Sequence, residues 1–164
     1  MVYRIPAVNL VGRGCLAQLK DEIGTLGCKK ALVVSDKFLT ENGVVEKVTK
    51  VLDQVGIEHT LYNDVKQNPS VANVEGGLEV LKKENCDFIV SIGGGSPQDC
   101  GKAISVLATN GGKITDYEGV NKSQKKCLPI VAIATTAGTS AEVTINYVIT
   151  DEETHIKMIM VDRN

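Results

Sequence analysis

The segment DFIVSIGGGSPQDC at residues 87–100 joins an apolar, strand-like run to three consecutive glycines and the start of a helix. Residues 87–92 are mostly apolar and do not alternate with polar residues, which predicts a strand buried on both faces. Glycines directly after such a strand let the backbone turn sharply and let a ligand come close to it. The segment is therefore either a ligand-binding turn or only a tight connection between a strand and a helix.

Apolar runs alternate with helical patterns along the rest of the chain. Further strands are expected at 31–35, 57–63 and 129–135, and helices at 44–55, 71–81 and 97–109. This alternation predicts an α/β fold with a Rossmann-like parallel sheet, right-handed crossovers and helices on both faces. The runs at 144–149 and 155–162 predict a C-terminal β-hairpin appended to that sheet. Residues 2–11 alternate loosely and predict an edge strand or hairpin.

The glycine segment does not follow the standard dinucleotide fingerprint G-x-G-x-x-G. Gly93 and Gly95 fit the first two glycines, but Gln98 occupies the third position. The acidic residue that the fingerprint requires about 20 positions later is also missing from its place, since Asp36 ends an earlier strand.

A helix start is nevertheless expected here. Ser96 is a suitable N-cap, Pro97 suits the first helical position, and Asp99 completes a variant of the capping box. The free N–H groups of a helix N-terminus bind anions, so a pyrophosphate would fit above Gly94, Gly95 and Ser96. The charge of Asp99 would repel a phosphate bound too close, so Asp99 either caps the helix or faces a sugar.

A second group of small polar residues follows the strand at 129–135. In the segment ATTAGTSAE (134–142), hydroxyl groups come from Thr135, Thr136, Thr139 and Ser140. Ligands of parallel sheets bind outside the carboxyl ends of the strands, where both this loop and the glycine segment are expected. The alternative is a polar loop whose hydroxyls cap a helix. Asp36 ends another strand at this edge, where it would either cap the next helix or bind a ribose and favour NAD over NADP.

Composition restricts the classes of function. A chain of 164 residues favours one domain, and 18 Lys and Arg against 20 Asp and Glu leave no basic block for nucleic acid. Five cysteines without a CxxC pair argue against a disulfide framework or a structural zinc site. No apolar run approaches the roughly 20 residues that span a bilayer, and the N-terminus lacks the apolar core of a signal peptide. A cytoplasmic protein without a membrane partner is expected.

Five segments together resemble the iron-containing (group III) alcohol dehydrogenases: VSDK (34–37), GVVEKV (43–48), NPS (68–70), GGGSPQDCGKAI (93–104) and TTAGTSAEVTINYVITDEE (135–153). The resemblance implies a dehydroquinate synthase-like N-terminal domain that binds a dinucleotide and spans residues 1–164. It also implies a helical, metal-binding C-terminal domain that this chain does not contain. Within the family, residues 93–99 and 141–153 look most like lactaldehyde reductase (1,2-propanediol oxidoreductase).

The resemblance assigns roles around an NAD cofactor. Asp36 would contact the adenosine ribose, and Asp99 would lie near the nicotinamide ribose. Gly94, Gly95 and Ser96 would bind the pyrophosphate. The remaining cofactor-binding positions would be Asn68, Thr135, Thr136, Thr139, Ser140, Asn146 and Lys157.

The resemblance also places the metal ligands, one Asp and three His, after the end of this chain. His59 and His155 are interpreted as structural or surface residues, so no catalytic or metal-binding residue is assigned here. In the full-length enzyme, Fe²⁺ would assist hydride transfer between small alcohols or diols and aldehydes, in a homo-oligomer.

This chain alone is predicted to be inactive, and as a fragment it should expose apolar surface. The alternatives are a zinc-type relative of glycerol dehydrogenase and a non-catalytic nucleotide-binding module.

Overall fold

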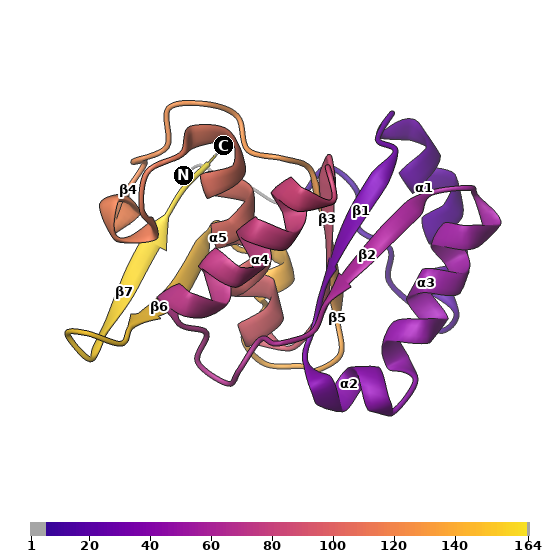
Figure 1. Ribbon diagram of the computed structural model, residues 1–164. Helices are drawn as coiled ribbons and strands as arrows, with labels where there is room; N and C mark the ends of the chain where they lie inside the picture. Colours follow the sequence, from indigo (N-terminus) through magenta and orange to yellow (C-terminus); the bar gives the residue numbers. More distant parts are fainter. Residues whose placement is uncertain (1–5, 164) are drawn as a thin grey trace, which may run out of the picture.

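The computed structural model describes residues 6–163 and contains a four-stranded parallel sheet at its centre (Figure 1). The strands are β1 (Lys30–Val34), β2 (Glu58–Tyr62), β3 (Phe88–Gly93) and β5 (Ile130–Ala134), in the order β2-β1-β3-β5. Every neighbouring pair is parallel, as predicted. Each strand begins and ends within one residue of the predicted range. In β1 and β3, runs of apolar and β-branched residues mark a buried strand clearly.

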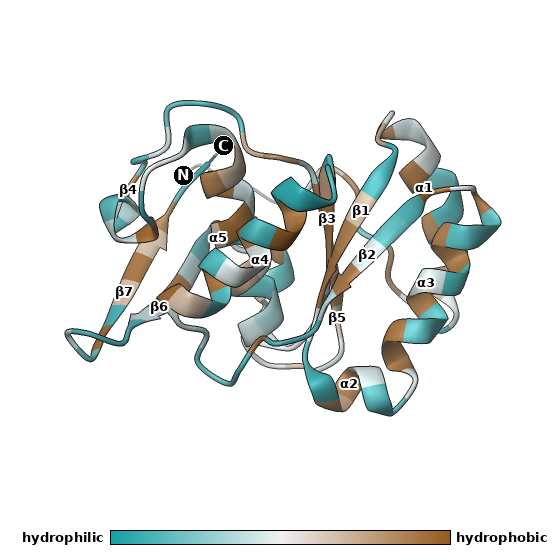
Figure 2. Cartoon of the chain, viewed as in Figure 1, coloured by the Kyte–Doolittle hydropathy of each residue, from teal (hydrophilic) through white to brown (hydrophobic). Residues whose placement is uncertain are grey.

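Helices cover both faces of this sheet, which confirms the predicted fold class. One face carries α1 (Leu19–Thr25) and α3 (Val44–Gln54), and the other carries α4 (Val71–Lys83) and α5 (Gly95–Asn110). Alternate side chains of a strand point to opposite faces, so Leu32 packs toward α4 and α5 while Val33 packs toward α1 and α3. Figure 2 shows the resulting hydrophobic strands between the helices.

Short elements complete the chain. Helix α2 (Lys37–Glu41) follows β1, and three 3-10 turns occupy η1 (Cys15–Gln18), η2 (Ile114–Tyr117) and η3 (Ala141–Val143). The Ser70 side chain caps α4 by accepting a hydrogen bond from the Asn73 N–H at 3.4 Å, and α4 begins at Val71, where the helix at 71–81 was predicted to begin.

A second sheet contains β4 (Gly119–Val120), β6 (Asn146–Asp151) and β7 (Ile156–Val161) in the order β4-β7-β6. The β6–β7 hairpin is confirmed, but its predicted attachment to the parallel sheet is wrong. Each of its strands alternates between buried and more exposed residues, and its inner face, with Tyr147 and Met160, packs on α4 and α5. These two helices therefore lie between two sheets (Figure 1).

The predicted N-terminal strand is only partly within the described residues. Residues 6–11 form no strand, and residues 2–5 lie outside the described range. No helix between residues 6 and 163 is both long enough and apolar enough to cross a membrane.

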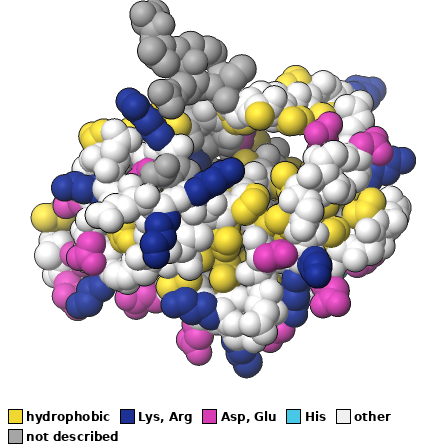
Figure 3. All heavy atoms as spheres, turned by 90° about the horizontal axis from the view of Figure 1, so that it is seen from above, with side chains coloured by type: hydrophobic (Ala, Val, Ile, Leu, Met, Phe, Trp, Pro, Cys, Tyr) yellow, Lys and Arg dark blue, Asp and Glu magenta, His cyan; other side chains and the backbone are white. Residues whose placement is uncertain are grey.

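Several large apolar side chains are exposed. Figure 3 views the molecule from the top of Figure 1, where the parallel strands begin, and shows apolar side chains gathered near the middle of this face. Elsewhere, Val120, Ile156 and Ile159 of the second sheet are between 54% and 61% exposed.

Candidate functional site

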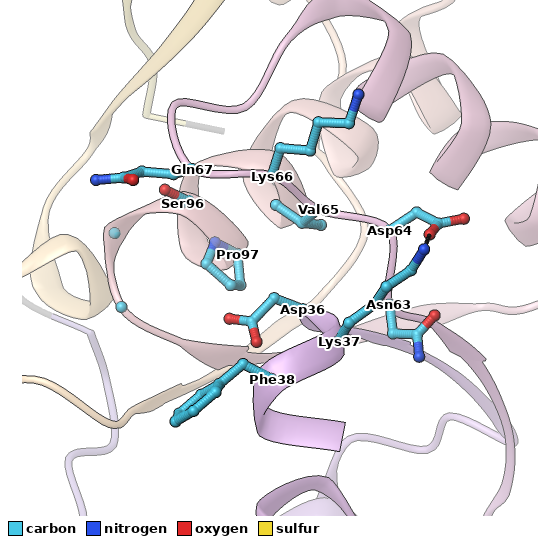
Figure 4. A pocket seen from close by; sticks show the side chains of 12 residues that line it. Asp36, Lys37, Phe38, Asn63, Asp64, Val65, Lys66, Gln67, Ser96 and Pro97 are labelled. Atoms are coloured by element: carbon cyan, nitrogen blue, oxygen red, sulfur yellow. Dashed lines mark ion pairs between the residues drawn. The ribbon is translucent and has the colours of Figure 1, made fainter. Parts of the chain in front are cut away.

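A cavity of about 470 Å³ lies where the carboxyl ends of β1, β2 and β3 meet (Figure 4). Strand β1 has β2 on one side and β3 on the other, so the strand order reverses at this point. Open parallel sheets bind ligands in the crevice at such a reversal. The lining residues are Asp36, Lys37, Phe38, Asn63, Asp64, Val65, Lys66, Gln67, Gly94, Gly95, Ser96 and Pro97.

The glycine turn, residues 93–96, forms one wall of this cavity. Gly93 has a φ of 150°, and a Cβ at this position would lie 2.5 Å from Cγ of Pro97. Gly94 is the N-cap of α5, which begins at Gly95. The prediction that Ser96 caps the helix and Pro97 is its first residue is therefore wrong, because the turn made at Gly93 lets the helix begin earlier.

The N-terminus of α5 faces the cavity with free donors. The N–H groups of Gly95 and Ser96 lie in the first turn and have no acceptor within the helix, while Pro97 has no N–H. The Ser96 side chain does not cap the helix; its Oγ accepts a hydrogen bond from the Asn68 N–H at 3.3 Å. A helix of 16 residues with two free N–H groups at a cavity is suited to bind an anion.

Asp99 does not cap the helix. Its Oδ2 accepts a hydrogen bond from the Val148 N–H of β6 at 3.0 Å, so the predicted capping box is wrong. Burial raises the pKa of the Asp99 carboxyl, and the bond from Val148 partly offsets that effect. The first turn of α5 contains no acidic residue, so the expected repulsion of a phosphate by Asp99 is weakened.

Two residues explain why the third fingerprint glycine is dispensable. That glycine normally permits close packing of helix and strand. Here Gly101 has this role, since a Cβ there would lie 3.1 Å from Cβ of Ser91. Gln98, at the position of the missing glycine, is buried, and its Nε2 donates to the Ile133 carbonyl at 3.1 Å while the Ser91 hydroxyl donates to its Oε1. Gln98 thus fastens α5 to β3 and β5.

The threonine loop, residues 135–140, packs against the glycine turn. The Thr135 N–H donates to the Gly93 carbonyl at 3.0 Å. A Cβ on Gly94 would lie 2.9 Å from Oγ1 of Thr136, and one on Gly95 would lie 3.3 Å from Thr139. The structure therefore brings both predicted loops together, and the hydroxyl-bearing residues of the threonine loop are exposed. Ser140 has a φ of 53° and makes no capping bond to η3.

Asp36 caps a helix, as one of the two interpretations of the sequence predicted, and it also lines the cavity. Its Oδ1 accepts a hydrogen bond from the Leu39 N–H at 2.8 Å and so caps α2. The same carboxylate lines the cavity, where Figure 4 shows it directed toward the space below Pro97. Lys37 and Asp64 form an exposed ion pair of 3.1 Å beside it, which contributes little to stability.

Asn68 links the glycine turn to the second sheet. Its Oδ1 accepts a hydrogen bond from Nζ of Lys157 on β7 at 2.9 Å, and its N–H bonds to Ser96. Asn146 takes part in a different group, since its carbonyl accepts a hydrogen bond from Nζ of Lys102 at 2.9 Å. The structure thus joins Asn68, Ser96 and Lys157 directly.

Sequence reasoning missed part of the cavity wall. Residues 63–67 and Phe38 line the cavity but were not assigned to a site. Their position in the sequence could have indicated this role, because residues 63–67 follow β2 at the same edge of the sheet as the glycine turn. Strand β2 is an edge strand with exposed residues, so its sequence gives a weaker signal than those of the buried strands.

The described residues also show where the two histidines lie. His59 is in β2, with Nε2 3.0 Å from Oδ1 of Asp53, and His155 lies in the turn between β6 and β7 with a φ of 58°. Within residues 6–163, no group of three or more His, Cys, Asp or Glu side chains is placed to hold a metal ion.

A parallel sheet with a cavity at its strand-order reversal and a glycine turn before a helix is the arrangement in which open α/β domains bind ligands. Residues 6–164 match the family described as iron-containing alcohol dehydrogenase, and the chain belongs to this family. It is 51% identical over 162 residues to alcohol dehydrogenase 4 of Schizosaccharomyces pombe, covering 99% of this chain and 38% of the relative. Lactaldehyde reductase of Escherichia coli is 46% identical, with 92% of this chain and 40% of the relative covered.

Solved structures agree with the fold. A crystal structure of 1,3-propanediol oxidoreductase superposes with a TM-score of 0.95 at 42% identity, covering 98% of this chain and 42% of the other. A sulfoacetaldehyde reductase from Bifidobacterium kashiwanohense, solved in complex with NAD+, gives a TM-score of 0.89 at 33% identity, covering 98% and 43%. The chain therefore spans about two fifths of the length of the relatives it matches.

Proposed function

We propose that this chain is the NAD-binding domain of an iron-containing alcohol dehydrogenase that interconverts small alcohols or diols and aldehydes. The observation that carries the proposal is the cavity at the reversal of strand order, with the free N–H groups of Gly95 and Ser96 in its wall. The family assignment and the relative solved with NAD+ support the choice of cofactor.

The chemistry of these residues suits a dinucleotide. The missing Cβ atoms of Gly94 and Gly95 let the threonine loop pack against the glycine turn. The helix N-terminus beside them lines the cavity, where a pyrophosphate would bind. Asp36 keeps one carboxylate oxygen beyond its capping bond, and this oxygen would accept from the adenosine ribose and repel a 2′-phosphate. Thr135, Thr136, Thr139 and Ser140 would form the opposite wall.

The nicotinamide half would extend toward the second sheet. Asn68 and Lys157 are already bonded to each other beside Ser96 and would orient this half, together with Asp99 and Asn146. The cofactor supplies the hydride chemistry, and the role of this chain is to bind and orient it.

The activity of the whole enzyme is part of the proposal. Relatives named lactaldehyde reductase and 1,3-propanediol dehydrogenase suggest a small alcohol or diol as substrate, with the lactaldehyde type preferred on the motifs at 93–99 and 141–153. We expect the whole enzyme to be cytoplasmic, to use Fe²⁺ and to form a homo-oligomer. This chain alone should show no turnover of 1,2-propanediol with NAD and Fe²⁺, and robust metal-dependent turnover would contradict that expectation.

Calorimetric titration of the chain with NADH and NADPH tests the cofactor assignment. Wild type should bind NADH at least about tenfold more tightly than NADPH, a difference of about 1.4 kcal/mol. Asp36→Ser should reduce this preference while keeping the cap of α2, since serine is also a good N-cap.

Asp64→Ser is the matched control, because it removes the same charge from the same cavity without altering the residue expected to bind the ribose. Absence of NADH binding would contradict the proposed function. An unchanged preference in Asp36→Ser would contradict the role of Asp36 alone.

A further inference from the structure

Lys102 makes an unusual set of contacts for a lysine on a helix. Its Nζ donates to the carbonyls of Ala141 at 2.6 Å, Thr144 at 2.9 Å and Asn146 at 2.9 Å, and lies 3.3 Å from Oγ1 of Thr144. These partners are 39 to 44 residues away in the sequence. A single ammonium group therefore ties α5 to the segment that connects the threonine loop to β6.

Burial of this ammonium must be compensated by its partners. Burial lowers the pKa of the Lys102 side chain, while the nearby carboxylates of Asp99 and Glu142 act in the opposite direction. The three carbonyls supply an acceptor for each proton of the ammonium group. Asp99, one turn earlier on α5, accepts from the Val148 N–H, so two charged groups of one helix fasten residues 141–148 at adjacent points.

The segment held by Lys102 has little regular structure of its own. Helix η3 contains three residues, and Ser140 before it has a left-handed φ without a capping bond. The threonine loop is joined to the sheet at its other end by the bond from the Thr135 N–H to Gly93. The bonds of Lys102 begin at Ala141, two residues after Thr139, and thus fix the far end of the loop.

We propose that Lys102 is a positioning residue that holds the threonine loop against the glycine turn and so shapes the cofactor site. This inference rests on the proposed function, because the loop matters only if the cofactor binds there. Lys102 does not line the site cavity; it lines a separate cavity of about 250 Å³ beside α5 and β6. Its effect on the cofactor therefore passes through the loop that it holds.

A double-mutant cycle distinguishes a positioning role of Lys102 from a purely structural role, because the two roles predict different results. Lys102→Met removes the ammonium group, and Thr136→Ala with Thr139→Ala removes the hydroxyls through which the loop would act. NADH affinity is measured by calorimetry in the four resulting proteins, and thermal unfolding is recorded for each. Lys47→Met on the exposed surface of α3 is the control for loss of a lysine charge.

We expect Lys102→Met to weaken NADH binding about tenfold in the wild-type background, which corresponds to about 1.4 kcal/mol. In the background without the two threonine hydroxyls, the same change should weaken binding less than about twofold, because coupled residues are not additive. Lys47→Met should leave the affinity unchanged. If Lys102→Met does not fold, Lys102→Gln, which retains two N–H donors, replaces it in the same cycle.

Equal losses in both backgrounds, or no loss in a folded variant, would overturn the role of Lys102 while leaving NADH binding by the wild type intact. Failure of the wild type to bind NADH would overturn the proposed function and this inference with it.

Discussion

The glycine turn and the threonine loop form two walls of the same site, but different forces hold them. The turn is fixed by packing: Gly93 leaves no room for a Cβ against Pro97, and α5 beyond it is buried. The loop is exposed and is fixed by polar bonds at its two ends, from Thr135 to Gly93 and from Lys102 to Ala141. A substitution that breaks the packing of Gly93 against Pro97 should therefore affect folding, whereas substitutions that move the loop should affect binding.

The largest effect is expected from Gly93→Ala. The added Cβ would lie 2.5 Å from Pro97 Cγ at a φ of 150°, and such a clash with strain costs about 3 kcal/mol of unfolding free energy. Gly111→Ala is the control, because Gly111 has a φ of 74° but open space around it, so strain alone costs about 1 kcal/mol. Urea denaturation measures both, and equal losses would contradict the claim that packing fixes the turn.

The next largest effect is expected from raising the pH, through the core residue Tyr62 at the end of β2. The Tyr62 hydroxyl donates to the Asn73 carbonyl at 2.8 Å, and burial raises the pKa of Tyr62 to about 12. A folded pKa above that of the unfolded chain, which is about 10, means that the folded state holds the proton more tightly. This contribution is complete below about pH 10 and is lost as the pH rises toward about 12, at a cost of up to about 2 kcal/mol.

Denaturant titrations between pH 9 and 12 check this dependence, with Tyr62→Phe as the comparison. The variant should lose the part of the pH dependence that belongs to Tyr62. An unchanged pH profile in Tyr62→Phe would contradict this explanation.

Gly95→Ala should separate binding from folding. The added Cβ would lie 3.3 Å from Thr139, so the exposed loop must shift, while the helix itself tolerates alanine well. We expect about tenfold weaker NADH binding, or about 1.4 kcal/mol, with unfolding free energy changed by less than about 1 kcal/mol. Gly24→Ala in α1, where no atom lies within 4 Å of the added Cβ, should leave binding unchanged.

Strands β1, β3 and β5 could be predicted from the sequence because they are apolar runs with little polar interruption, and the edge strand β2 lies between two predicted helices. The second sheet could be predicted only in part: the hairpin was visible, but β4 has two residues and pairs with β7 across about forty positions of the sequence. Such a pairing leaves no local signal. The predicted cap at Ser96 failed because the backbone turn at Gly93 outweighed the local capping preference.

The parts of the site that depend on residue type could be predicted from the sequence. The parts that depend on tertiary contacts could not. Glycines, threonines and Asp36 at the ends of strands indicated the two walls and the acidic group. Lys102 was not assigned any role, because a lysine on an amphipathic helix is normally solvated. Only the fold shows that three distant carbonyls surround it.

The central claim is that the cavity between β1 and β3 binds the pyrophosphate of NAD at the start of α5. Titrating the ¹⁵N-labelled chain with NADH and following amide chemical shifts tests it directly. We predict saturable shifts that are largest at Gly94, Gly95 and Ser96. Saturable binding that leaves these three amides unchanged, or that shifts amides around the second cavity at Ser105 and Tyr147 instead, would contradict the claim.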